Sequence, residues 1–204
     1  MSDTHAIFNF HCSHYIECMT EYSKNVDKLL NQLGEMHGVG EYGMFTSYIP
    51  QHHWSATIIH AYAAFEQKLN EACQITASTR SLGLHFKNFA GQGVSRARLY
   101  LESYAQLHLN VRSDQWQHVD ALGKLRNTLV HGGFSKEHAN FKFLSAYAKR
   151  TRALSVSDDE LQIGSRTVTF ALEKLGGPLQ AVGEAILGLQ NEKSGETLMI
   201  QPQS

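Results

Sequence analysis

One segment of the chain combines an arginine, an amide and a histidine within six residues. In Leu125-Arg-Asn-Thr-Leu-Val-His131-Gly-Gly, Arg126 directly precedes Asn127 and lies five residues before His131. A guanidinium suits a phosphate, because its planar fork donates paired hydrogen bonds, and an imidazole transfers protons near neutral pH. We therefore take Arg126, Asn127 and His131 as the set best suited to phosphodiester chemistry.

The arginine-to-histidine spacing alone is a weak signal, because the chain contains 12 histidines. Similar spacings join Arg80 to His85 and Arg112 to His118. The first lies in a loop and the second straddles an expected helix start, and in neither case does Asn follow the arginine. Only Arg126 combines the polar neighbour, a late position in a helix and the glycines that end it.

The helix that carries this segment has the clearest periodicity in the sequence. It is expected to begin at Ser113 or Asp114 and to end at Gly132-Gly133, with Leu122, Leu125 and Leu129 on its buried stripe. Asn127 and His131 are one turn apart on another face. Arg126 is about 140° round the helix from His131, a separation its long side chain can bridge. The helix dipole favours a positive charge at the position of His131.

The remaining pattern predicts further helices and one small hairpin. The expected elements are a helix from Tyr15 to Gly34 or Gly38, a helix after Pro50 to about Ala77, a loop over 78–95 with a short turn at 84–89, a helix from Ser95, a helix from Ser135 to Arg152, a hairpin within 153–170, and a helix starting at Pro178. The fold class is therefore all-α with a minor β-hairpin near the C-terminus.

The Arg126–His131 segment resembles the RNxxxH form of the R-x(4–6)-H motif of the HEPN superfamily. Ala61-Tyr-Ala-Ala-Phe-Glu66-Gln-Lys-Leu looks like the earlier helix of that family with its glutamate, and Arg98-Leu-Tyr-Leu101 and Trp116 follow in the usual order. The resemblance covers about residues 50–190. It implies one HEPN-like domain, an antiparallel helical bundle, with 1–49 as an N-terminal helical extension and 191–204 as a flexible tail.

The resemblance also implies an activity, which is metal-independent cleavage of RNA to a 2′,3′-cyclic phosphate. Arg126 would bind the scissile phosphate, His131 would transfer protons, Asn127 would orient the pair, and Glu66 would support them. The cleft would form across a two-fold homodimer, with RNA as substrate and no metal or cofactor. The resemblance is also compatible with a toxin or phage-defence role, with an antitoxin or regulatory protein as partner. Toxins silenced by adenylylation commonly carry a tyrosine where this chain has Gly133, so that route of control is in doubt.

A non-catalytic alternative remains open. Arg126 would then pair with an acid such as Glu66, His131 would cap its helix, and the domain would be a dimerisation module or a nucleotide- or protein-binding module. Metal chemistry has weaker support. The segment His11-Cys12-Ser-His14 with Cys18 matches no standard zinc spacing, and no HExxH pattern surrounds His52, His53 and His60.

Composition narrows the possible partners and the compartment. Eighteen basic and 19 acidic residues give a net charge of −1, so the chain has no overall positive field to hold nucleic acid. A local basic strip over 80–112 and the end of the helix expected from Ser135 to Arg152 could hold RNA, although a solvated surface is the simpler interpretation. Three cysteines without a CxxC pair favour a reducing compartment. Without a signal-like or membrane-spanning apolar run, we expect a cytoplasmic protein that does not enter a membrane.

Overall fold

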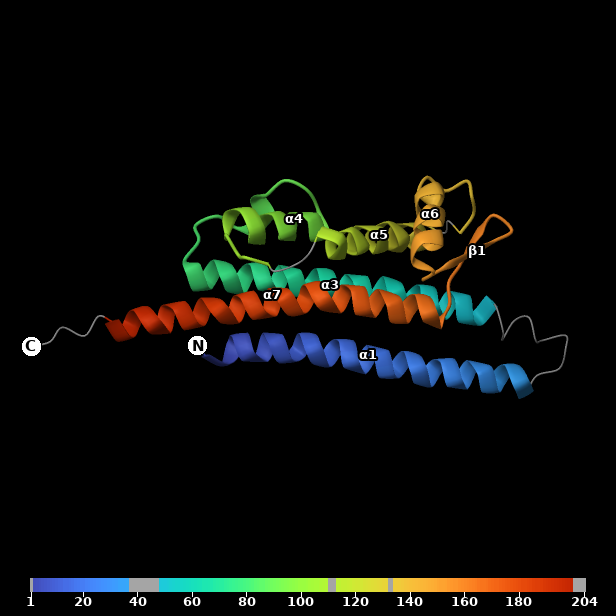
Figure 1. Ribbon diagram of the computed structural model, residues 1–204, viewed down its shortest axis with the longest axis horizontal. Helices are drawn as coiled ribbons and strands as arrows, with labels where there is room; N and C mark the ends of the chain where they lie inside the picture. Colours follow the sequence, from blue (N-terminus) through green and yellow to red (C-terminus); the bar gives the residue numbers. More distant parts are fainter. Residues whose placement is uncertain (1, 37–47, 110–112, 132–133, 200–204) are drawn as a thin grey trace, which may run out of the picture. The chain divides into compact units, whose positions relative to one another are not determined.

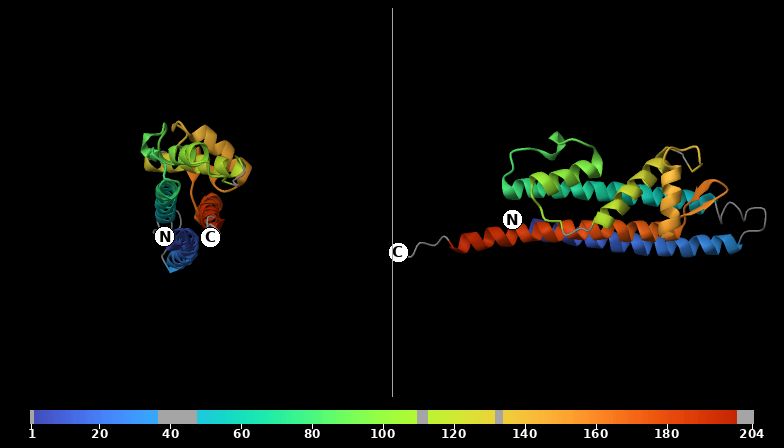
Figure 2. Two further views of the ribbon diagram at one scale, coloured as in Figure 1. Left: turned by 90° about the vertical axis from the view of Figure 1, so that its left-hand side faces the viewer. Right: turned by 45° about the horizontal axis from the view of Figure 1, so that its top comes forward.

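The computed structural model describes residues 2–36, 48–109, 113–131 and 134–199 (Figures 1 and 2). The fold is all-α with one small hairpin, as predicted. The elements, in chain order, are α1 (Ser2–Met36), α3 (Ile49–Arg80), the 3-10 turn η2 (Phe86–Asn88), α4 (Gly93–Leu99), the π-helical turn η3 (Tyr100–Tyr104), α5 (Ser113–Val130), α6 (Phe141–Thr151), β1 (Ser155–Ser157), β2 (Glu160–Gln162) and α7 (Ser165–Met199). None of the helices in the described ranges has the length and apolar character needed to cross a membrane.

The chain groups into two compact units, each assembled from segments far apart in the sequence. The first unit comprises Met1–His14, Ala64–Arg112 and Gly176–Ser204, and the second comprises Tyr15–Ala63 and Ser113–Leu175. The helices α1, α3 and α7 each contribute residues to both units.

The first unit has a core of apolar side chains around the middle of α3 and the turn that follows α4. Cys73 donates a hydrogen bond to the carbonyl oxygen of Ala97 at 3.6 Å, and the ring of Tyr100 packs against those of Phe89 and Tyr104. Tyr100 is 0% exposed and belongs to the core. Other buried residues of this unit are Phe8, Cys12, Leu69, Ala72, Leu101, Leu179, Val182 and Ile186.

The second unit has its core around α5. The predicted buried stripe of this helix is confirmed, because Leu122, Leu125 and Leu129 are 2%, 1% and 8% exposed. Leucines at this spacing share one helix face, and full burial of each contributes about 1.5–3 kcal/mol. Further large buried side chains of this unit include Trp54, Ile58, Trp116, Val119, Leu144, Tyr147, Leu154, Leu161, Ile163, Val168, Leu172 and Leu175.

The hairpin is built on a two-residue turn and is tied to the segment that follows α5. Asp158 and Asp159 both have positive φ, 50° and 62°, the conformation of a tight turn whose twist matches that of the flanking strands. The backbone N–H of Leu161 donates to the carbonyl of Phe134 at 2.8 Å, and that of Lys136 donates to the carbonyl of Asp159 at 2.9 Å. The hairpin and α6 therefore lie at the end of α5 (Figure 1).

Two expected helix starts are wrong. The helix predicted from Ser135 begins at Phe141. Ser135 instead forms a β-bridge with Glu160, because backbone pairing with the hairpin outweighs its preference for a helix cap. The last helix begins at Ser165 rather than Pro178 and includes 168–170, which lie within the range of the predicted hairpin. Pro178 removes only one N–H from this long helix, whose apolar period continues on both sides.

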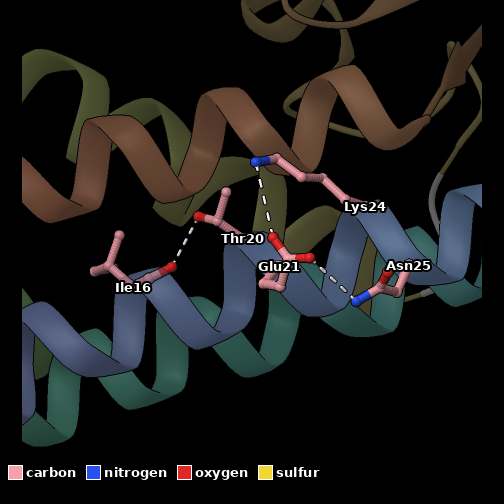
Figure 3. Close-up of polar contacts among 5 residues, drawn as sticks. All are labelled: Ile16, Thr20, Glu21, Lys24 and Asn25. Atoms are coloured by element: carbon pink, nitrogen blue, oxygen red, sulfur yellow. Dashed lines mark hydrogen bonds and ion pairs between the residues drawn. The ribbon is translucent and has the colours of Figure 1, made fainter.

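The first helix also differs from expectation, because it begins at Ser2 rather than Tyr15 and its predicted apolar stripe is incompletely covered. Tyr22 and Leu29 of that stripe are 47% and 53% exposed. Polar contacts within the helix support it (Figure 3). Thr20 donates to the carbonyl of Ile16 at 2.8 Å, and Glu21 accepts a hydrogen bond from Asn25 and lies 3.9 Å from the ammonium of Lys24. Such pairs stabilise a helix without burying it.

We predict that Arg152→Gly stabilises the protein. Arg152 caps the C-terminus of α6 with φ 55° and ψ 20°, a left-handed conformation that costs a side-chain-bearing residue about 1–2 kcal/mol and glycine little. After the entropy that glycine adds to the unfolded chain, the free energy of unfolding should rise by about 0.5–1 kcal/mol in urea denaturation. The control Lys149→Gly, in the right-handed last turn of the same helix, should lower it by up to about 1 kcal/mol. Equal effects of the two changes would contradict the prediction.

Candidate functional site

The end of α5 positions the three residues of the predicted motif. Because Leu125 and Leu129 face the core, Arg126 is partly exposed and Asn127 is exposed. His131 is exposed and directly follows the last residue of α5, and its backbone N–H donates to the carbonyl of Asn127 at 3.2 Å, which continues the helical pattern. The imidazole is thus held at the helix C-terminus with its ring accessible.

Arg126 and Asn127 are in direct contact. The Nη1 of Arg126 donates a hydrogen bond to the Oδ1 of Asn127 at 2.9 Å. Side chains at adjacent helix positions do not normally face each other, so the guanidinium must bend along the helix to make this bond. The Nε of Arg126 is buried and lacks a hydrogen-bond partner in the described part of the chain.

No described carboxylate forms an ion pair with Arg126. The pairing with an acid that the non-catalytic alternative required is therefore not observed among the described residues. The positive charge of the guanidinium stays available to a ligand, and Asn127 fixes its direction without neutralising it.

Glu66, expected to support the motif, belongs to the first unit. An ideal Cβ added at Gly93 would lie 3.0 Å from the Oε1 of Glu66, and Gly93 has a φ of +53°. The carboxylate thus lies against the first residue of α4, where both the close approach and the backbone conformation favour glycine. A supporting role for Glu66 toward Arg126 stays a prediction.

A polar cluster beside the motif was not predicted. Thr128 is fully buried and donates to the carbonyl of Lys124 at 2.9 Å. Its hydroxyl accepts from the side-chain amide of Asn140 at 3.4 Å, while the backbone N–H of Asn140 donates to the Nδ1 of His138 at 3.2 Å. This cluster attaches the turn over 135–140 to the last turn of α5. Its members are distant in sequence, and His138 and Asn140 fell within a predicted helix, so no local signal could have identified it.

A second unpredicted contact joins α5 to α6. The Nδ1 of His118 lies 2.6 Å from the hydroxyl of Tyr147. Burial raises the pKa of Tyr147 to about 12. Burial, followed by the charges of Lys174 and Arg150, lowers the pKa of His118. At neutral pH both groups are therefore uncharged and share one hydrogen bond.

The other residues considered from the sequence have local contacts. Within the described ranges, no three His, Cys, Asp or Glu side chains are placed to hold a metal ion. In the basic strip, Arg80 donates to the carbonyl of Ala105, and Arg98 forms an ion pair with Glu102 at 3.1 Å. Two basic side chains of that strip, Arg80 and Arg98, thus already contact other groups of the protein. Arg112 and Gly133 lie outside the described residues.

The His118 pair predicts a pH dependence of stability. Because the folded state lowers the pKa of His118, the unfolded chain binds a proton more readily. His118 therefore stabilises the folded state above the pKa of the unfolded chain, about 6.5. This stabilisation is lost as the pH falls toward the lower pKa of the folded state. In urea denaturation from about pH 8 to about pH 5, His118→Gln should lose less stability on acidification than the wild type. Parallel curves for the two proteins would contradict this.

Comparison of the chain with family models, with curated proteins and with solved structures found no match. The geometry at the end of α5 is what supports a function. It consists of an unneutralised guanidinium fixed by an amide, and an accessible imidazole one helical turn beyond that amide.

Proposed function

We propose that the protein is a metal-independent endoribonuclease of HEPN type. The observation that carries this proposal is the hydrogen bond between Arg126 and Asn127, one turn before the exposed His131 and without a carboxylate among the described residues to neutralise the arginine. A phosphate-binding cation and a proton-transferring group thus share one helix end. RNA is the substrate class that uses both, because its 2′-hydroxyl supplies an internal nucleophile.

The guanidinium would bind the scissile phosphate. Asn127 occupies one N–H of Nη1, and the remaining donors of Arg126 are sufficient for a bidentate contact with two phosphate oxygens. This contact would stabilise the negative charge that grows on the phosphate as it is attacked. Asn127 acts through Arg126 and is therefore a positioning residue.

His131 would move the protons. The 2′-oxygen attacks phosphorus and loses its proton to a neutral imidazole, the bond from phosphorus to the 5′-oxygen breaks, and that oxygen takes a proton from an imidazolium. The products are a 2′,3′-cyclic phosphate and a 5′-hydroxyl. One imidazole cannot be base and acid in the same step, so His131 from each of two chains would share the work in a homodimer.

The biological setting that we propose is the cytoplasm, where RNA is abundant. An endoribonuclease needs restraint in the cell that makes it. A toxin or phage-defence effector held by an antitoxin or regulatory protein fits this requirement. The sequence has Gly133 where an adenylylated tyrosine would stand in related toxins, which favours restraint by binding over restraint by modification.

Cleavage of RNA in EDTA tests the proposed activity. The wild type should cut a single-stranded RNA and leave 2′,3′-cyclic phosphate ends, while His131→Ala and Arg126→Ala should each lose at least about 100-fold in rate. His108→Ala, which removes an exposed histidine outside α5, is the matched control and should cut like the wild type. Binding of RNA without cleavage by any of the four proteins would instead support the non-catalytic module. Loss of wild-type cleavage in EDTA would indicate a metal-dependent nuclease.

The Asn127 contact gives a second, graded test. Asn127→Ala frees the guanidinium and should slow cleavage about tenfold, the value of one hydrogen bond to a charged group. Asn127→Asp should slow it further, because a carboxylate in that position would pair with Arg126 and compete with phosphate. Asn127 is exposed, so thermal unfolding of both variants should match that of the wild type. A faster Asn127→Asp than Asn127→Ala would remove Asn127 from the proposed site.

A further inference from the structure

A pocket of about 550 Å³ lies within the second unit, where the end of α6, the hairpin and the start of α7 meet. Its charged lining residues are Lys149, Arg152 and Arg166, and all three are exposed. Among the described residues that line it, none is acidic. We call this feature the hairpin pocket.

The three cations of the hairpin pocket are not neutralised by the protein. None of them forms an ion pair with a carboxylate in the part of the chain that the structure describes. Like charges that converge on a concave surface with apolar walls concentrate their field there. The pocket therefore attracts anions, in a chain whose overall net charge is −1.

The uncharged part of the pocket has apolar residues beside the polar Ser155, Gln162 and Thr167. Leu154 and Ile163 are buried, and Val156 of β1 is 37% exposed. A surface of this kind suits the flat face of a base, while the cations suit a phosphate. The size of the pocket also falls in the range of sites that bind small organic ligands, so one nucleotide is a reasonable occupant.

Arg152 holds its place in the pocket at a conformational cost. Its φ of 55° is one that glycine adopts more readily, and glycine is the common residue at this position after a helix. Strained backbone of this kind clusters at binding sites, where the side chain has a function. A side chain at this position is thus consistent with a binding role for its guanidinium in the pocket.

The hairpin pocket is connected to the end of α5. The backbone of Leu161, in β2, is bonded to Phe134, and that of Asp159, in the turn, is bonded to Lys136, both soon after His131. One wall of the pocket and the segment that follows the motif are therefore held together within the second unit.

On these grounds we propose that the hairpin pocket binds a nucleotide of single-stranded RNA, with its phosphate against Lys149, Arg152 and Arg166 and its base on the apolar wall. This proposal rests on the proposed function, because it takes the RNA substrate as the ligand. It assigns substrate binding to residues that the Arg126 motif does not include.

Binding measurements on the full-length His131→Ala protein, which leaves the RNA intact, test the proposal. The probe is a fluorescent single-stranded RNA of about 12 nucleotides, followed by anisotropy at several salt concentrations. Adding Arg152→Gly and Arg166→Gln should weaken binding at least about tenfold and reduce the salt slope by about 1.4, as expected for two lost phosphate contacts. The matched control adds Lys28→Gln and Lys142→Gln, which remove the same charge from exposed positions of the second unit outside the pocket.

Equal binding by the pocket variant and the control would overturn the proposal, even if the EDTA assay shows cleavage that needs His131. Conversely, pocket-dependent RNA binding by a wild type that cuts no RNA would support the pocket and refute the nuclease. Uridine monophosphate and inorganic phosphate are tested as competitors. If either binds as tightly as the RNA and depends on Arg152 and Arg166, the site is for a free nucleotide or phosphate, and the RNA assignment is wrong. Urea denaturation of each variant excludes unfolding as the cause of lost binding.

Discussion

Burial of one face of α5 is the constraint on which the site depends. Leu122, Leu125 and Leu129 occupy that face, and removing any of them from the core would cost a few kcal/mol. Because a helix has a fixed rotation per residue, this burial also fixes the direction of every other residue on α5. Arg126, Asn127 and the following His131 are therefore presented outward by leucines that have no part in the chemistry.

The contacts between α5 and α6 extend this control to the hairpin. The hydroxyl of Tyr147 in α6 is hydrogen-bonded to the Nδ1 of His118, and the ammonium of Lys124 lies 3.7 Å from the centre of the Phe143 ring. Both contacts combine packing with a polar or charged interaction, which restricts how α6 can rotate. Since α6 carries Lys149 and is capped by Arg152, the placement of these two pocket cations follows from the same helix that presents the motif.

Much of this architecture was predictable because it follows from periodicity. The helix expected after Pro50 to about Ala77 is Ile49–Arg80, and the one expected to end at Gly132 is Ser113–Val130. The prediction is wrong where backbone pairing between distant segments decides the local structure, as at Ser135. The same contrast between local patterns and long-range contacts applies at the candidate site. The motif itself is a local pattern, whereas Thr128, His138 and Asn140 meet through a turn that no spacing rule describes.

The division of α7 between the two units has a consequence for how the two cores are completed. Residues to Leu175 complete the second unit, and those from Gly176 complete the first. Neither unit is a contiguous stretch of sequence, so each unit needs residues of α7 to complete its core.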